Sequence, residues 1–67
     1  MMRNATALIT GGNGHIGRAI ATNLSVRGCN IRLIDKNADG MDAFCEELSA
    51  SNGVSAIGKS ADLGDPN

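Results

Sequence analysis

The chain of 67 residues is poor in aromatic side chains: it has a single Phe, at position 44, and no Trp or Tyr. Small independent cores usually depend on aromatic residues for much of their apolar surface. A chain of this length also buries only about 60% of the surface that it exposes when unfolded. We therefore expect residues 1–67 to be one part of a larger folding unit rather than a complete domain.

Clustered charge, cysteine and long apolar runs are scarce too. The formal net charge is -1, and the six Lys and Arg residues are scattered, which argues against a nucleic-acid partner. No apolar run approaches the length of a membrane span, and the N-terminal apolar stretch is too short for a signal peptide. Cys29, Cys45 and one His are too few ligands for a metal site. We interpret both cysteines as reduced, buried thiols of a cytoplasmic protein.

Apolar runs of strand length alternate with segments in which apolar residues recur at helical spacing. The clearest helical stripe lies between Met41 and Leu48. The pattern predicts strands over residues 5–10, 30–35 and 54–60, and helices over residues 14–27 and 38–51. Asp65 and Pro66 are typical of the N-cap and first residue of a further helix.

This β-α-β-α-β order predicts an α/β fold of the Rossmann type. Right-handed crossovers would place both helices on the same face of a parallel sheet with strand order 3-2-1. Alternation along the first strand would turn Ala7 and Ile9 to one face and Leu8 to the other, so one set would meet water. Because parallel sheets are almost always covered on both faces, we expect residues 1–67 to be the first half of a doubly wound domain.

The first predicted strand runs into the sequence Thr-Gly-Gly-Asn-Gly-His-Ile-Gly, at positions 10–17. A turn from a strand into a helix offers backbone N–H groups and the positive end of the helix dipole to an anion such as phosphate. In the dinucleotide-binding fold, the first glycine makes the turn, the second admits the pyrophosphate and the third allows close helix–strand packing. The spacing assigns these roles to Gly11, Gly14 and Gly17, and we expect Gly12 to add freedom to the turn.

The alternative is a glycine-rich turn that binds nothing. A phosphate loop of the nucleotide-triphosphatase type is excluded, because no Gly-Lys-Ser/Thr follows. Three features favour the dinucleotide: a strand precedes the glycines, a helix follows them, and acidic residues end the next two strands. Asp35 lies 18 residues after Gly17, close to the roughly 20 expected of an acid that binds ribose.

Asp35 and Lys36 bear on which dinucleotide is bound. A carboxylate at the end of the second strand can accept hydrogen bonds from the adenosine ribose and would repel a 2′-phosphate, which favours NAD over NADP. Lys36 could instead receive that phosphate, or it could be a solvated charge. Asp35 could likewise be a solvated turn residue without a ligand.

The other residues of the turn have less specific patterns. His15 could face the pyrophosphate or pack at the end of the helix, and no nucleophile or second acid near it indicates a catalyst. Arg18 could touch phosphate or lie on the solvent side of the helix. Asn13 is expected to hydrogen-bond within its own turn.

Residues 8–21 resemble the N-terminal cofactor signature of the short-chain dehydrogenase/reductase family. Residues 24–35 are similar to the family's approach to its second strand, and residues 61–65 to the segment after its third strand. The resemblance covers essentially the whole chain. It implies an NAD(P)-dependent oxidoreductase that moves hydride between NAD(H) and a small alcohol or carbonyl substrate, and that assembles as a homo-oligomer.

The resemblance also implies roles for individual residues. Thr10 would stabilise the turn and Ile16 would lie beneath the cofactor. Asp62 would accept a hydrogen bond from the adenine amino group, unless it is a loop acid without a ligand, and Leu63 would pack beside the adenine ring. The predicted cofactor site therefore consists of Thr10, Gly11, Gly12, Asn13, Gly14, His15, Ile16, Gly17, Asp35, Lys36, Asp62 and Leu63.

The glycine spacing leaves the branch of the family open. Simple reductases usually carry Thr-Gly-x-x-x-Gly-x-Gly, whereas this chain has Thr-Gly-x-x-Gly-x-x-Gly. That spacing resembles the extended branch, which contains NAD-dependent sugar-nucleotide epimerases and dehydratases. The run Asp35-Lys36-Asn37 and the helix after it resemble the simple reductases. A non-catalytic module that only binds a dinucleotide is the third alternative.

The resemblance does not supply a catalyst within these residues. The family uses a Tyr as general acid/base, a Lys four residues further on and a Ser that orients the substrate. This sequence has no Tyr. We therefore expect residues 1–67 to lack the catalytic half of the enzyme and to be inactive alone, because the hydride chemistry belongs to the nicotinamide and needs a substrate held beside it.

Overall fold

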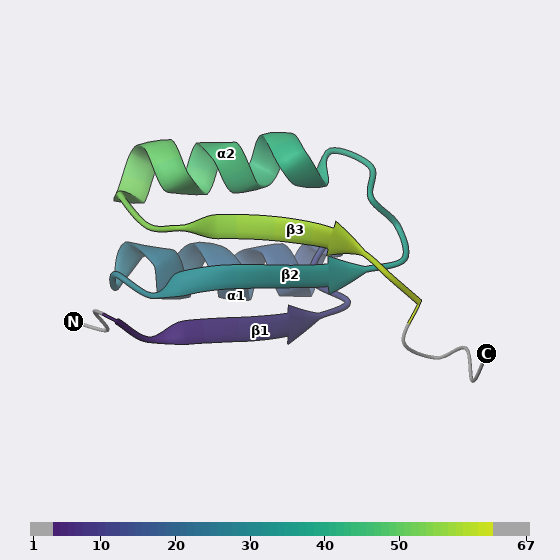
Figure 1. The fold of residues 1–67 in the computed structure, drawn as a ribbon, viewed down its shortest axis with the longest axis horizontal. Coiled ribbons are helices and arrows are strands. Elements are labelled where there is room, and N and C mark those ends of the chain that lie inside the picture. Colours follow the sequence, from purple (N-terminus) through teal and green to yellow (C-terminus); the bar gives the residue numbers. More distant parts are fainter. Residues whose placement is uncertain (1–3, 63–67) are drawn as a thin grey trace.

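The computed structural model describes residues 4–62, which form an α/β unit (Figure 1). Its elements follow in the predicted order: β1 (Thr6–Thr10), α1 (His15–Val26), β2 (Asn30–Asp35), α2 (Met41–Asn52) and β3 (Ala56–Ser60). Each element overlaps the range predicted for it. The helix start predicted at Asp65 and Pro66 lies outside the described residues.

The strands form one parallel sheet in the order β1-β2-β3. Thr6 is paired with Asn30 where β1 meets β2, and Ile31 with Ala56 where β2 meets β3. Both helices pack against the face of the sheet that carries the β2 side chain of Leu33. Right-handed crossovers produce this arrangement, because each helix must return the chain to the start of the next parallel strand.

A left-handed glycine follows α1. Gly28 has a φ of 91°, and its N–H donates to the carbonyl oxygen of Ser25 at 3.0 Å. The N–H of Cys29 donates to the carbonyl oxygen of Leu24 at 3.1 Å. This is the hydrogen-bond pattern of a Schellman motif, which satisfies the last carbonyls of the helix.

The second helix begins at Met41 rather than at residue 38, where the apolar pattern suggested. Gly40 precedes it with a φ of 70°, in the left-handed region. The residues before Gly40 form turns of their own, in which the Asp39 N–H donates to Oδ1 of Asn37 at 3.0 Å. Helical backbone therefore starts only after the glycine.

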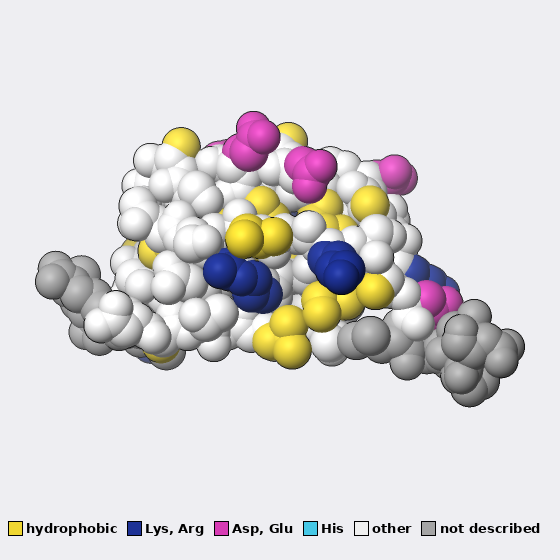
Figure 2. Space-filling view, viewed as in Figure 1, with side chains coloured by type: hydrophobic (Ala, Val, Ile, Leu, Met, Phe, Trp, Pro, Cys, Tyr) yellow, Lys and Arg dark blue, Asp and Glu magenta, His cyan; other side chains and the backbone are white. Residues whose placement is uncertain are grey.

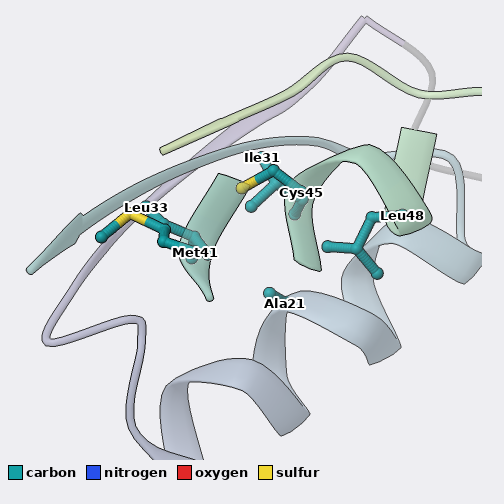
Figure 3. Packing of buried hydrophobic residues seen from close by; sticks show 6 residues of the cluster. All are labelled: Ala21, Ile31, Leu33, Met41, Cys45 and Leu48. Atoms are coloured by element: carbon teal, nitrogen blue, oxygen red, sulfur yellow. The ribbon is translucent and has the colours of Figure 1, made fainter. Parts of the chain in front are cut away.

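The core lies between β2 and the two helices (Figure 3). Each of its buried members is at most 4% exposed. They are Ala21, Ile31, Leu33, Met41, Cys45 and Leu48. Removing each large apolar side chain from water contributes about 1.5–3 kcal/mol. Cys29 and Cys45 are free and buried, as interpreted from the sequence.

Neither helix of the described residues covers the opposite face of the sheet. Leu8 of β1 is 64% exposed and Ile57 of β3 is 53% exposed, whereas Ile9 packs against the core. Figure 2 shows this face, with hydrophobic side chains beside Lys and Arg over the strands. The prediction that one set of β1 side chains meets water is thus confirmed. No helix within residues 4–62 is long and apolar enough to cross a membrane.

Candidate functional site

The glycine-rich turn lies at the carboxyl ends of the strands. The N–H of Gly11 donates to the carbonyl oxygen of Ile34 at 2.7 Å, which fixes the start of the turn to β2. A cleft of about 240 Å³ opens beside this contact. It is lined by Thr10, Gly11, Ile34, Asp35, Lys36, Ala61 and Asp62. The carboxyl ends of parallel strands are where open α/β sheets bind their ligands.

Three glycines of the turn are required by the fold itself. Gly11 has a φ of +65°, which L side chains rarely adopt. A Cβ on Gly17 would lie 2.5 Å from the Cα of Gly12, so α1 packs directly on the turn. A Cβ on Gly12 would lie 2.5 Å from Cδ2 of Leu33. Gly12 has no positive φ, so it serves close packing on β2 and not the freedom of the turn that we predicted.

Gly14 differs from these three. It is the N-cap of α1, with a φ of -82° and a ψ of 174°, a conformation open to any residue. A Cβ there would meet only the carbonyl oxygen of Gly11, at an ordinary 3.7 Å. No side chain among residues 4–62 caps α1, and its first turn has no acidic residue. Within residues 4–62, neither backbone strain nor a close contact requires glycine at this position.

Asp35 ends β2 and receives hydrogen bonds from two different loops. Its Oδ1 accepts from the N–H of Asn37 at 3.0 Å, and its Oδ2 from the N–H of Asn13 at 2.9 Å. These two bonds, that from Asn37 first, hold the pKa of Asp35 below its usual value, because they stabilise the carboxylate. Neighbouring Lys36 lowers the pKa further and partial burial opposes the shift. Asp35 is therefore an anion at neutral pH.

The prediction that Asn13 hydrogen-bonds within its own turn is wrong for the N–H donors of its side chain, which reach another loop. Its side chain is 9% exposed and reaches the loop between β2 and α2. Its Nδ2 donates to the carbonyl oxygens of Asn37 and Asp39, both at 2.8 Å. These partners lie 24 and 26 residues away in the sequence, so no local motif indicates them.

Arg18 lies neither free in solvent nor in the cleft. Its Nε donates to Oδ1 of Asn13 at 2.9 Å, and its Nη2 to the same Oδ1 and, at 2.9 Å, to the carbonyl oxygen of Asp39. Its guanidinium lies over the ring of Phe44, 5.0 Å from the centroid. Arg18 thus joins the glycine turn, the loop after β2 and α2. This role was missed, because only the packing of α2 beside α1 brings the partners together.

The remaining predicted residues lie near the carboxyl ends of the strands. Thr10, Lys36 and Asp62 line the cleft. His15 and Ile16 begin α1 and are exposed, Ile16 by 79%. Leu63 lies outside the described residues. Among residues 4–62 there is no group of three or more His, Cys, Asp or Glu side chains that could hold a metal ion.

Comparison with known proteins places this geometry in a family. The family model described as short chain dehydrogenase matches residues 5–67. The chain is 40% identical over 63 residues to L-xylulose reductase from Aspergillus niger. That match covers 90% of this chain and 21% of the relative, so the chain spans about a fifth of the relative's length.

Two solved structures have the same fold. The NADPH-dependent 3-quinuclidinone reductase from Rhodotorula rubra matches with a TM-score of 0.90 and 28% identity, over 96% of this chain and 24% of that one. The L-sorbose reductase from Gluconobacter frateurii, complexed with NADPH and L-sorbose, has a TM-score of 0.88 and 28% identity, over 97% of this chain and 25% of that one. The sequence, the fold and the family match agree: the chain belongs to the short-chain dehydrogenase family.

Proposed function

We propose that residues 1–67 hold the adenosine diphosphate part of a nicotinamide dinucleotide, as the first half of a doubly wound domain in an NAD(P)-dependent oxidoreductase. The observation that carries this proposal is the shared cleft. The glycine turn and the Asp35 carboxylate flank one cavity at the carboxyl ends of β1, β2 and β3. A dinucleotide needs both features at this place, a turn for its pyrophosphate and an acceptor for its ribose.

The pyrophosphate would lie against the start of α1. Gly14 leaves open the space that a side chain would fill, and no side chain of the part of the chain that the structure describes caps the helix. Backbone N–H groups at such a helix start, together with the helix dipole, attract phosphate. Thr10 and Gly11 would border it on the β1 side, and exposed Ile16 would lie beneath the cofactor. His15 and Gly17, in the first turn of α1, would lie beside the pyrophosphate.

The adenosine would lie over the ends of β2 and β3. Asp35 would accept from the ribose hydroxyls, and its negative charge disfavours a 2′-phosphate, which supports NAD over NADP. Lys36 lines the same cleft, and its positive charge could receive the 2′-phosphate of NADP. Solved relatives are described with NADPH, so the preference has to be measured. Asp62 and Leu63 would contact the adenine.

The substrate would be a small alcohol or carbonyl compound. The matched relatives are described as reductases of L-xylulose, L-sorbose and 3-quinuclidinone. On that ground we propose reductase chemistry rather than that of a sugar-nucleotide epimerase or dehydratase. The catalytic groups would come from beyond residue 67. A cytoplasmic location and a homo-oligomeric assembly belong to the same proposal.

Binding can be tested at Gly14, which the fold leaves free to change. In the protein expressed from its complete reading frame, Gly14→Val should keep its thermal midpoint within a few degrees. Its affinity for NAD and for ADP should fall more than about tenfold, because the side chain occupies the approach of the pyrophosphate. Gly14→Ala should give a smaller loss. Isothermal titration with NAD, NADP and ADP measures all three affinities.

Asn23→Val, an exposed change elsewhere on α1, is the matched control and should bind like the parent. If ADP binds Gly14→Val as tightly as the parent, the pyrophosphate does not lie at this turn. If neither dinucleotide binds the parent protein, the proposed function is wrong.

A further inference from the structure

The side chain of Asn13 has no hydrogen-bonding capacity left for a ligand. An amide offers two N–H donors and an oxygen with two lone pairs. Both donors are used by backbone carbonyls of the loop after β2, and the oxygen accepts from Nε and Nη2 of Arg18. The side chain is also nine-tenths buried. The side chain of Asn13 therefore acts by positioning other residues of the protein.

The amide of Asn13 joins the glycine turn to the loop after β2, and each of these two segments donates a backbone N–H to the Asp35 carboxylate. One donor is the backbone N–H of Asn13 itself, in the glycine turn. The other is the N–H of Asn37, whose carbonyl oxygen accepts from Nδ2 of Asn13. The three residues thus form a closed ring of hydrogen bonds. A change in the distance between the turn and the loop would pull at least one donor away from the carboxylate.

Arg18 holds the amide in place from the other side. Its guanidinium donates to Asn13 and to Asp39 while it lies on the ring of Phe44. The planar fork of arginine can make these contacts at once, and the ammonium of lysine cannot reproduce them. Two other charged groups line the cleft beside Asp35, namely Lys36 and Asp62. The backbone and the positive charge of Lys36 also lower the pKa of Asp35, by less than the N–H groups of Asn37 and Asn13 do.

We propose that Asn13 and Arg18 are a positioning pair that sets the direction of the Asp35 carboxylate, and through it the choice between a free ribose 2′-hydroxyl and a 2′-phosphate. The choice of ligand rests on the proposed function. The positioning itself does not, because it concerns only contacts within the chain. Neither residue touches the dinucleotide through its side chain in this proposal.

The test uses two variants of the protein expressed from its complete reading frame. Asn13→Ala removes the amide and leaves the backbone N–H that Asp35 uses. Arg18→Lys keeps the charge and removes the fork. Asn23→Ala and Arg27→Lys are the matched controls, because both residues are exposed at positions of α1 or its C-cap. Two quantities are measured: the carboxyl pKa of Asp35 by carbon NMR without ligand, and the ratio of the dissociation constants of NADP and NAD.

In Asn13→Ala, the pKa of Asp35 should rise toward its usual 3.8, and the preference for NAD over NADP should fall about tenfold, as expected when a charged hydrogen bond is misplaced. Arg18→Lys should change both quantities in the same direction by less, and the controls should change neither. The pKa distinguishes positioning from a general loss of stability, because it is read in the folded protein.

The outcomes separate the two proposals. If NAD binds the parent but both variants keep the parental pKa and the parental ratio, the positioning pair is wrong and the proposed function stands. If no dinucleotide binds the parent, the proposed function and the ligand choice both fail. A raised pKa in the variants would then support positioning alone. If Asn13→Ala does not fold, Arg18→Lys decides by the same two measurements.

Discussion

The two helices of this protein begin in opposite ways. α1 starts after Gly14, in extended backbone, with no acidic residue in its first turn and a cleft beside the turn that leads into it. α2 starts after Gly40, in the left-handed region, and carries Asp42 in its first turn. An acid in the first turn compensates the positive end of the helix dipole. α2 thus has a charge of its own sequence at its positive end, whereas α1 has none in its first turn; under the proposed function, the pyrophosphate would supply that charge.

The two helix starts also differ in whether the backbone requires glycine there. At Gly40 the backbone requires glycine, since its φ is +70°. At Gly14 neither the backbone nor a contact does. A glycine that the described fold does not need is a better indication of a ligand than one that the turn requires. Substitutions of Gly14 should therefore lower dinucleotide affinity more than stability, and substitutions of Gly40 should lower stability more than affinity.

The largest effect is expected at Gly17, where α1 touches the turn. In Gly17→Ala the new Cβ would stand 2.5 Å from the Cα of Gly12 and 2.7 Å from the carbonyl oxygen of Gly11. Both neighbours are backbone and cannot move aside cheaply. We expect a loss of about 3 kcal/mol in the free energy of unfolding, measured by urea denaturation. A loss no greater than that of Gly14→Ala would contradict the close packing of α1 on the turn.

A smaller effect is expected at the start of α2. Gly40→Ala places a Cβ in the left-handed region and should cost about 1–2 kcal/mol. The Cβ would also lie 3.4 Å from Nη2 of Arg18, a contact that a small shift relieves. Because Gly40 does not line the cleft, the affinity for NAD should fall much less than in Gly14→Val. Urea denaturation measures the stability of both variants, and titration calorimetry on the same preparations measures their affinity for NAD. If Gly40→Ala loses as much affinity as Gly14→Val, the two helix starts do not differ in the way proposed.

Asp42→Asn should have a modest effect on stability. The acid interacts with the dipole at the start of α2, which is worth about 0.3–1 kcal/mol at low ionic strength. Salt should reduce the difference between the variant and the parent, because the acid is exposed. Thermal unfolding at low and high salt measures this. A difference that does not shrink with salt would show that Asp42 acts by a contact rather than by its charge.

The smallest effect is expected from acidification around Asp35. Its pKa is lowered in the folded protein, chiefly by the N–H groups of Asn37 and Asn13, so folding is favoured by the ionised form. This contribution is complete above the unfolded value near 3.8 and is lost as the pH falls through the lower folded value. Stability of the parent should therefore decline more steeply below pH 3.8 than that of Asp35→Asn. Parallel pH profiles would show that the two hydrogen bonds do not favour the carboxylate.

Local pattern predicted the elements well, because each depends on residues close in the sequence. The apolar run of β1 and the stripe from Met41 to Leu48 indicated a strand and a helix at nearly the observed bounds. Gly40 caused the one clear displacement, since helical periodicity does not reveal where a left-handed residue interrupts the backbone. Most residues that line the cleft were also among those predicted for the cofactor site, because parallel strands bring their carboxyl ends to one edge. They are Thr10, Gly11, Asp35, Lys36 and Asp62.

The sequence by itself determined the order of strands and helices, the glycine turn after β1 and an acid at the end of β2. All three follow from short-range periodicity and from the conformations that glycine permits. Only the tertiary structure decided that Gly12 is needed by Leu33, and that Asn13 and Arg18 tie the turn to the loop after β2. Those partners are more than twenty residues apart or on different elements. They meet only because burial of one shared core packs α1 and α2 side by side on the same face of the sheet.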